Sequence, residues 1–172
     1  DIKSGTQFGL SLGAQVTVRD SDKSSDVHNV QIQTPHGVGY MPRRHLVPCD
    51  HKVTDWVAIA ESLLGTPYSW GGRDSRGLDC SALIQLALQT AGIAAPRDSG
   101  PQAATLGDLL ADDVPLKRGD LLFWKGHVGI MRDADMLLHA NGHTMDVALE
   151  PLADAIERIG YLYGQPTHYR RP

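Results

Sequence analysis

The sequence predicts an α+β domain that is preceded by a small all-β barrel. The first 48 residues contain short segments in which apolar and polar residues alternate, as is typical of strands. From residue 55 the apolar residues instead follow helical spacing, and short apolar runs typical of strands come after them. Helices followed by an antiparallel sheet define the α+β class. We therefore expect a barrel over residues 1–48, a linker over 49–54 and a second domain over 55–172.

The predicted barrel is built from three alternating segments. Residues 15–19 and 30–33 each alternate apolar and polar side chains, and the polar stretch 20–29 between them predicts a loop. A Thr-Pro-His-Gly sequence over 34–37 predicts a turn into a further strand over 38–41. This pattern of short strands with turns is typical of a small barrel.

In the second domain, two helices have clear start signals. The first covers residues 55–64, with Thr54 or Asp55 as its cap and Gly65 and Pro67 at its end. The second covers residues 79–91 and has an apolar stripe along one face. The remaining predicted elements are short helical pieces over 99–110, strands over 121–124, 127–131 and 136–140, a helix over 151–159 and a last strand over 161–170.

Composition excludes several classes of protein. With 172 residues, 41% hydrophobic, the chain can bury a core, so intrinsic disorder is not expected. A net charge of −4 argues against a protein that coats nucleic acid, and no apolar run reaches the ~18 residues of a membrane span. We therefore expect neither a nucleic-acid nor a membrane partner, while the oligomeric state stays open.

The cysteine count limits metal and disulfide chemistry. Only Cys49 and Cys80 are present, which excludes a disulfide framework and a Cys-rich zinc site. A zinc site at His139 and His143 is weaker still, since no second thiol lies nearby in the sequence, so no metal or other cofactor is expected. The chain starts at Asp1 without an apolar leader, which suggests a processed form or a fragment; a free Cys49 without a leader favours the cytoplasm over the periplasm or secretion.

The sequence around Cys80 suggests a nucleophile. Asp79 lies where a helix N-cap is expected, so Cys80 falls in the first helical turn. There the helix dipole and free N–H groups favour an anion, which lowers the pKa of a thiol and leaves donors for an oxyanion. The alternative is that Cys80 is a small buried apolar residue, as most cysteines are.

Two histidines would supply the base that a cysteine nucleophile needs. If residues 127–131 and 136–140 form a hairpin whose turn is centred on Ala134, then Gly129 lies opposite His139 and His127 is its diagonal neighbour. Both imidazoles then share one face, with His127 as base and His139 as the residue that orients it. A one-residue change in the turn would separate them, and two strand histidines can also be merely structural.

Five motifs follow one another in the sequence: Gly-Thr-Pro-Tyr-Ser-Trp-Gly-Gly at 65–72, Leu-Asp-Cys-Ser at 78–81, Arg-Gly-Asp-Leu at 118–121, Gly-His-Val-Gly-Ile at 126–130 and Leu-His-Ala at 138–140. In this order they resemble the motifs of the NlpC-type cell-wall peptidases, papain-like cysteine hydrolases of peptidoglycan stem peptides. The first segment is similar to a bacterial SH3-like domain, with residues 38–42 as its closing strand. Together with Pro-Arg-Asp-Ser at 96–99, this combination is similar to the branch that cuts after γ-D-glutamate in short muropeptides.

The resemblance implies a role for each motif residue. Cys80 would be the nucleophile, His127 the base and His139 the third member of the triad. Six further residues would bind the substrate: Tyr68 beside the scissile carbonyl, Asp79 and Ser81 flanking the thiol, and Arg97, Asp98 and Ser99 around the L-Ala-γ-D-Glu part.

The implied function is a cysteine endopeptidase. It would hydrolyse the γ-D-glutamyl-L-diamino acid bond of peptidoglycan stem peptides or released muropeptides, with a free N-terminal L-Ala, as in murein peptide recycling. Two alternatives stay open: a thiol amidase or acyltransferase acting on another acyl group, and a wall-binding module without activity. The intact Cys80, His127 and His139 argue against the last of these.

Overall fold

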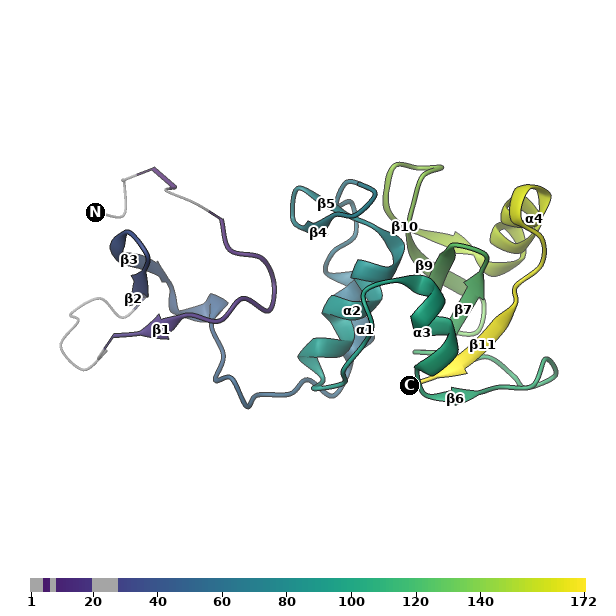
Figure 1. Cartoon of the computed structure of the whole chain (residues 1–172), viewed down its shortest axis with the longest axis horizontal. Coiled ribbons are helices and arrows are strands. Elements are labelled where there is room, and N and C mark those ends of the chain that lie inside the picture. Colours follow the sequence, from purple (N-terminus) through teal and green to yellow (C-terminus); the bar gives the residue numbers. More distant parts are fainter. Residues whose placement is uncertain (1–4, 7–8, 20–27) are drawn as a thin grey trace. The chain divides into compact units, whose positions relative to one another are not determined.

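The computed structural model describes residues 5–6, 9–19 and 28–172, and the chain divides into two compact units, Asp1–Lys52 and Val53–Pro172 (Figure 1). The first unit contains an antiparallel sheet of order β1-β2-β3, in which Val30 and Ile32 are buried. Its elements are β1 (Thr17–Val18), β2 (Asn29–Thr34), β3 (Gly37–Pro42) and a 3-10 turn at Arg43–His45.

The predicted elements of this unit agree with the structure only in part. The strands expected at 30–33 and 38–41 and the turn between them are present, but the strand expected over 15–19 is limited to Thr17–Val18. The loop expected over 20–29 lies outside the described residues except at its end, where Asn29 already begins β2. The described residues form an open three-stranded sheet, and no closed barrel is seen among them.

A six-stranded antiparallel sheet forms the centre of the second unit (Figure 1). Its order is β10-β9-β8-β7-β11-β6, so β7 to β10 form a meander and β11 returns beside β7. The strands are β6 (Asp108–Leu109), β7 (Leu121–Trp124), β8 (His127–Met131), β9 (Met136–Asn141), β10 (Asp146–Pro151) and β11 (His168–Arg171).

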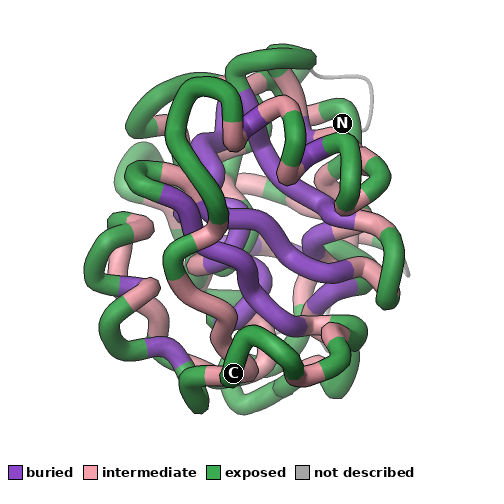
Figure 2. The backbone as a smooth tube through the Cα atoms, turned by 90° about the vertical axis from the view of Figure 1, so that its right-hand side faces the viewer, coloured by how far each residue is buried: buried purple, intermediate pink, exposed green. Residues whose placement is uncertain are grey.

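Helices pack on both faces of this sheet because alternate strand residues point to opposite faces. Leu121, Phe123, Val128 and Ile130 belong to the core formed with α1 (Trp56–Glu61) and α2 (Cys80–Thr90). The opposite face packs against α4 (Leu152–Tyr163), and its core residues are Leu122, Trp124, Met131, Leu137, Ala155 and Ile159. In Figure 2 the buried stretches run through the interior of this unit, with exposed segments around them. The shorter elements are β4 (Arg73–Asp74), β5 (Gly77–Leu78) and α3 (Ser99–Thr105).

Helix ends follow the predicted signals. Asp55 caps α1 by accepting a hydrogen bond from the backbone N–H of Ala58, and Asp79 caps α2 in the same way through Ala82. The α1 helix ends at Glu61, earlier than expected, and turns lead from it to Gly65.

Three expectations for the second unit were wrong or incomplete. Residues 99–110 contain one helix, α3, and then the edge strand β6 instead of helical pieces throughout. The α4 helix continues to Tyr163, so the last strand begins only at His168. Strand β10 was not predicted at all.

The Arg-Gly-Asp-Leu motif serves the fold. The Arg118 guanidinium donates hydrogen bonds to both Asp55 and Glu61 of the α1 region. Asp120 is fully buried and accepts hydrogen bonds from Arg171 at 2.7 and 2.8 Å, which joins the start of β7 to the end of β11. Since a buried carboxylate without a partner is strongly destabilising, this pair fixes the C-terminal strand. Among the described residues, no helix is both long and apolar enough to cross a membrane.

Candidate active site

The site is built around the start of α2. Asp79 has an extended backbone, and its side chain accepts hydrogen bonds from Ala82 N–H at 2.8 Å and from Gly71 N–H at 2.9 Å. The chain before it folds back tightly: a Cβ at Gly72 would lie 2.4 Å from the carbonyl oxygen of Gly77, so only glycine fits there. This loop therefore fixes the first turn of α2, where Cys80 lies.

Tyr68 lies in the same loop and is brought close to the thiol. Its backbone N–H donates to the carbonyl of Met145 at 2.8 Å, and it pairs with Leu78 just before the helix. Burial raises the pKa of Tyr68, and the nearby charges of Cys80 and Asp79 raise it further. Tyr68 therefore lies near Cys80, and its expected role beside the scissile carbonyl stays a prediction.

The Cys80 thiol is a free, buried sulfhydryl, only 7% exposed. Burial raises its pKa; backbone N–H groups of Val128 and Ser81 oppose this effect, while the charge of Asp79 adds to it. The expectation of a lowered thiol pKa was therefore wrong, because desolvation of the thiolate outweighs the favourable position at a helix start.

The two predicted histidines are in contact. His127 Nε2 and His139 Nδ1 are 2.9 Å apart, and the rings meet at 64° with centroids 5.2 Å apart. The hairpin register is Ile130 opposite Leu138, which centres the turn on Ala134 and confirms the expected shared face. Val128, which directly follows His127, supplies the N–H beside the Cys80 sulfur. Among the described residues, no hydrogen bond joins that sulfur to an imidazole.

Both histidines are held neutral. Burial lowers the pKa of His127 to about 3, and the nearby His139 and Arg158 lower it further. Burial also lowers the pKa of His139 to about 4, even though the carboxylate of Glu150 acts in the opposite direction. A neutral His127 can accept a proton at physiological pH, as a general base must.

Asp79, Ser81 and Arg97 form one cluster. Arg97 donates to both carboxylate oxygens of Asp79, at 2.8 and 2.6 Å, and to the Ser81 hydroxyl at 3.0 Å. Burial opposes ionisation of Asp79, but the hydrogen bonds from Arg97 and Ala82 with the charge of Arg97 outweigh it, so the pKa of Asp79 is lowered. Arg97 is therefore neither a solvated surface charge nor a free cation.

Asp98 and Ser99 begin α3 beside this cluster. Asp98 is exposed, and its side chain makes no capping hydrogen bond to the helix. The hydrogen bond to Asp79 raises the pKa of Arg97, and the charge of Asp98 raises it further by a smaller amount. The predicted substrate-binding residues thus lie on three segments, namely the loop with Tyr68, the start of α2 and the start of α3. Their contacts with a substrate stay a prediction.

Residues behind the histidine pair were missed in the sequence. Glu150 lies 3.2 Å from His139 through its Oε2 and Nε2 atoms, and Arg158 pairs with Glu150. The signal that could have found them is the alternation of Val147 and Leu149 with polar or small residues over 146–150, which was not recognised as a strand. In the described part of the chain, no three His, Cys, Asp or Glu residues are grouped so that they could hold a metal ion.

A helix that begins at a cysteine and packs against an antiparallel sheet carrying a histidine pair places this unit in the papain-like class of folds. Residues 65–158 match the model of the NlpC/P60 family, and the chain belongs to this family.

Comparison with individual proteins agrees. The chain is 29% identical over 137 residues to the gamma-D-glutamyl-L-lysine dipeptidyl-peptidase of Bacillus subtilis, which covers 73% of this chain and 46% of that protein. It spans between 31% and 60% of the length of several curated relatives. A crystal structure of an NlpC/P60 family protein from Bacillus cereus shares the fold, with a TM-score of 0.76 at 24% identity over 94% of this chain and 55% of that one. The structure of the peptidoglycan hydrolase RipB from Mycobacterium tuberculosis has a TM-score of 0.57 at 27% identity, over 76% of this chain and 68% of its own.

The depressed histidine pKa values predict acid-sensitive stability. The folded protein keeps His139 neutral down to about pH 4, whereas an unfolded histidine binds a proton below about pH 6.5. Between these values the unfolded state binds more protons, so stability is lost as the pH falls below 6.5. We expect His139 alone to contribute a loss of roughly 2 kcal/mol in the free energy of unfolding between pH 7 and pH 5.

Urea unfolding at both pH values, for the wild type and for His139→Gln, measures this loss. The variant should show a smaller difference between pH 7 and pH 5. An equal difference in both proteins would mean that His139 is not held neutral in the fold.

Proposed function

We propose that this protein is a cysteine peptidase that hydrolyses the γ-D-glutamyl-L-diamino acid bond of peptidoglycan-derived peptides. The observation that carries the proposal is the 2.9 Å contact between His127 and His139 close to the Cys80 thiol. Val128, the residue that follows His127 in β8, has its backbone N–H at the Cys80 sulfur. Family membership and the activity for which the Bacillus subtilis relative is named support the choice of substrate.

In the proposed reaction, Cys80 and His127 act as nucleophile and base. As the sulfur bonds to the γ-D-glutamyl carbonyl carbon, the thiol proton moves to His127. His127 then protonates the departing amine as the C–N bond breaks, which leaves a thioester on Cys80. Water attacks the thioester with His127 as base, and the sulfur leaves with a proton restored. In this proposal, backbone N–H groups near Cys80 would hold the oxyanion.

The substrate-binding roles follow from charge. We assign Asp98 as the acidic group that would receive the N-terminal ammonium of L-Ala. Asp98 is exposed, and among the described residues its carboxylate makes no hydrogen bond to the protein. Arg97 is committed to Asp79 and Ser81, so we assign it the role of holding these residues in place beside Cys80. Tyr68 and Ser99 complete the predicted pocket.

Incubation with synthetic L-Ala-γ-D-Glu-L-Lys and its meso-diaminopimelate counterpart tests the function. We expect the dipeptide L-Ala-D-Glu and the free diamino acid as products, identified by mass spectrometry. N-acetylation of the L-Ala should lower kcat/KM by roughly ten- to a hundredfold, because it removes one charge-assisted hydrogen bond. No cleavage of either peptide would contradict the assigned substrate.

A second candidate, an acyltransferase using the same thiol, differs only in the group that accepts the acyl chain. Adding a primary amine to the tripeptide reaction distinguishes the two, since a transferase would give the dipeptide amide in excess of the hydrolysis product. We further infer that the first unit is an SH3-like domain; the antiparallel β2–β3 hairpin with buried Val30 and Ile32 supports this.

A further inference from the structure

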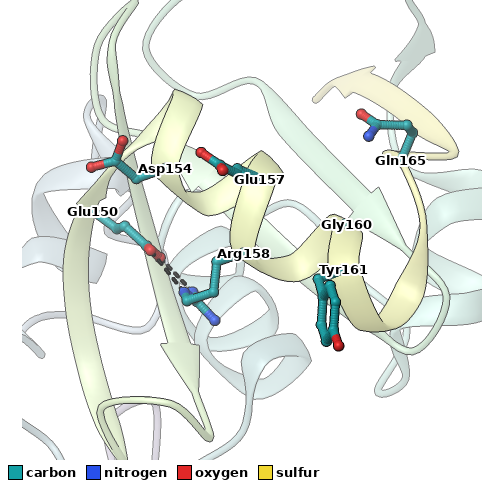
Figure 3. A pocket seen from close by; sticks show the side chains of 7 residues that line it. All are labelled: Glu150, Asp154, Glu157, Arg158, Gly160, Tyr161 and Gln165. Atoms are coloured by element: carbon teal, nitrogen blue, oxygen red, sulfur yellow. Dashed lines mark hydrogen bonds and ion pairs between the residues drawn. The ribbon is translucent and has the colours of Figure 1, made fainter.

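An ion pair lies directly behind the histidine pair. Glu150 on β10 and Arg158 on α4 are joined by hydrogen bonds, one of them 2.8 Å from Arg158 Nε to Glu150 Oε1 (Figure 3). The other carboxylate oxygen of Glu150 lies 3.2 Å from Nε2 of His139. This contact does not meet the geometry of a regular hydrogen bond, and the buried Nε2 has no hydrogen-bond partner among the described residues.

The register explains why these side chains meet. Ala148 lies opposite His139 on the neighbouring strand, and Glu150 is two residues further on the same face. The α4 helix packs against this face of the sheet, so Arg158 on that helix can donate a hydrogen bond to the carboxylate of Glu150. A row of contacts therefore runs from His127 through His139 and Glu150 to Arg158.

If His127 is the base, this row of contacts determines which ring nitrogen of each neutral imidazole carries the proton. Nε2 of His127 contacts His139, so only Nδ1 of His127 is available to take the proton of Cys80. For Nδ1 to be an acceptor, the proton of His127 must be on Nε2 and be donated to Nδ1 of His139. His139 must then carry its own proton on Nε2, where it faces the carboxylate of Glu150.

We propose that Glu150, held by Arg158, is a positioning residue that fixes the tautomer of His139 and through it the tautomer of His127. A carboxylate is the right group for this task because, when ionised, it can only accept a hydrogen bond. The proposal deepens the proposed function, since it assigns Nδ1 of His127 as the atom that takes the proton.

Arg158 keeps Glu150 in the accepting form. Its hydrogen bond and its charge hold the pKa of Glu150 below the ordinary value, against the effect of burial. The other titratable groups around His139 are His127 on β8 and His143 in the following loop, whose charge affects both His139 and Glu150. Asp154 and Glu157 line the same surface hollow as Glu150 and Arg158 (Figure 3).

Nuclear magnetic resonance of the full chain labelled with ¹⁵N-histidine tests the tautomers without using activity. At pH 7 we expect the wild type to show both His127 and His139 protonated on Nε2 alone. In Glu150→Ala, His139 should become a mixture of tautomers, whereas Glu150→Gln should keep more of the wild-type form because its amide oxygen can still accept. Glu157→Gln, which removes a charge from the same hollow, is the matched control and should leave both histidines unchanged.

Kinetics with the tripeptide provide the second readout. Glu150→Ala should lower kcat/KM by about ten- to a hundredfold, the effect of losing one charge-assisted hydrogen bond. In Arg158→Gln the pKa of Glu150 should rise, because the charge and hydrogen bond of Arg158 are removed. When the pH is lowered, this variant should therefore lose the Nε2–H tautomer of His139 and its activity at a higher pH than the wild type does.

Defined outcomes overturn the proposal. It fails if His139 of the wild type is protonated on Nδ1, if Glu150→Ala keeps the wild-type tautomer, or if the tautomer changes while kcat/KM does not. If Glu150→Ala does not fold, Arg158→Gln and Glu150→Gln give the same answer through their pH dependence. If the wild type shows the expected tautomers and their loss in Glu150→Ala but cleaves no peptide, the proposed substrate is wrong and the tautomer assignment stands.

Discussion

Replacing Cys80 with alanine should abolish hydrolysis of the tripeptide, with a loss of at least roughly 10³-fold in kcat. The thiol is the only side chain that the proposed mechanism uses as a nucleophile, and it lies at the start of α2 beside the Val128 N–H. The fold should survive, because alanine fits the space of the buried side chain and the capping contact of Asp79 goes to Ala82. Cys80→Ser should also be inactive, since a hydroxyl is a far weaker acid than a thiol and the neutral His127 is a weak base.

The second cysteine supplies the control for this experiment. Cys49 is exposed and free and belongs to the first unit, so Cys49→Ser should retain nearly the full rate. Treatment with a chelator should also leave the rate unchanged, because the mechanism involves no metal. Hydrolysis that survives Cys80→Ala, or that a chelator removes, would contradict the mechanism.

The parts of the site that depend on local spacing were predictable from the sequence. Asp79 as a cap places Cys80 in the first turn of a helix, and both features are present. The contact between His127 and His139 required only the period of two along strands and a turn centred on Ala134, which the register confirms. These features arise from residues close together in the chain, where geometry leaves few alternatives.

The features that depend on burial and on distant segments were not predictable in this way. A lowered pKa for Cys80 follows from its place on the helix, but the packing of the sheet over it removes water and reverses the sign. Glu150 could not be placed because its approach to His139 depends on the pairing of β10 with β9, and residues 146–151 were not recognised as a strand. The pairing of Arg97 with Asp79 joins residues 18 apart whose meeting depends on how α3 packs beside α2.

The two histidines should differ sharply when each is replaced by glutamine. His127→Gln should lose nearly all activity, because an amide cannot take the proton of Cys80. His139→Gln should keep a measurable rate, with a loss of about ten- to a hundredfold in kcat/KM. Its amide oxygen can still accept the hydrogen bond from Nε2 of His127, while its amide nitrogen can donate to Glu150.

This difference separates a catalytic from a positioning role and is measured as kcat/KM on the tripeptide at pH 7, with thermal unfolding of each variant as the check on folding. In the proposed mechanism neutral His127 transfers a proton in each step, whereas His139, 2.9 Å away, only holds it in the correct tautomer and orientation. His139→Ala, which can neither accept nor donate, should therefore be more impaired than His139→Gln although both remove the same imidazole. Equal and mild losses at positions 127 and 139 would show that neither imidazole is the base, and a His139→Gln variant as inactive as His127→Gln would assign His139 a direct part in proton transfer.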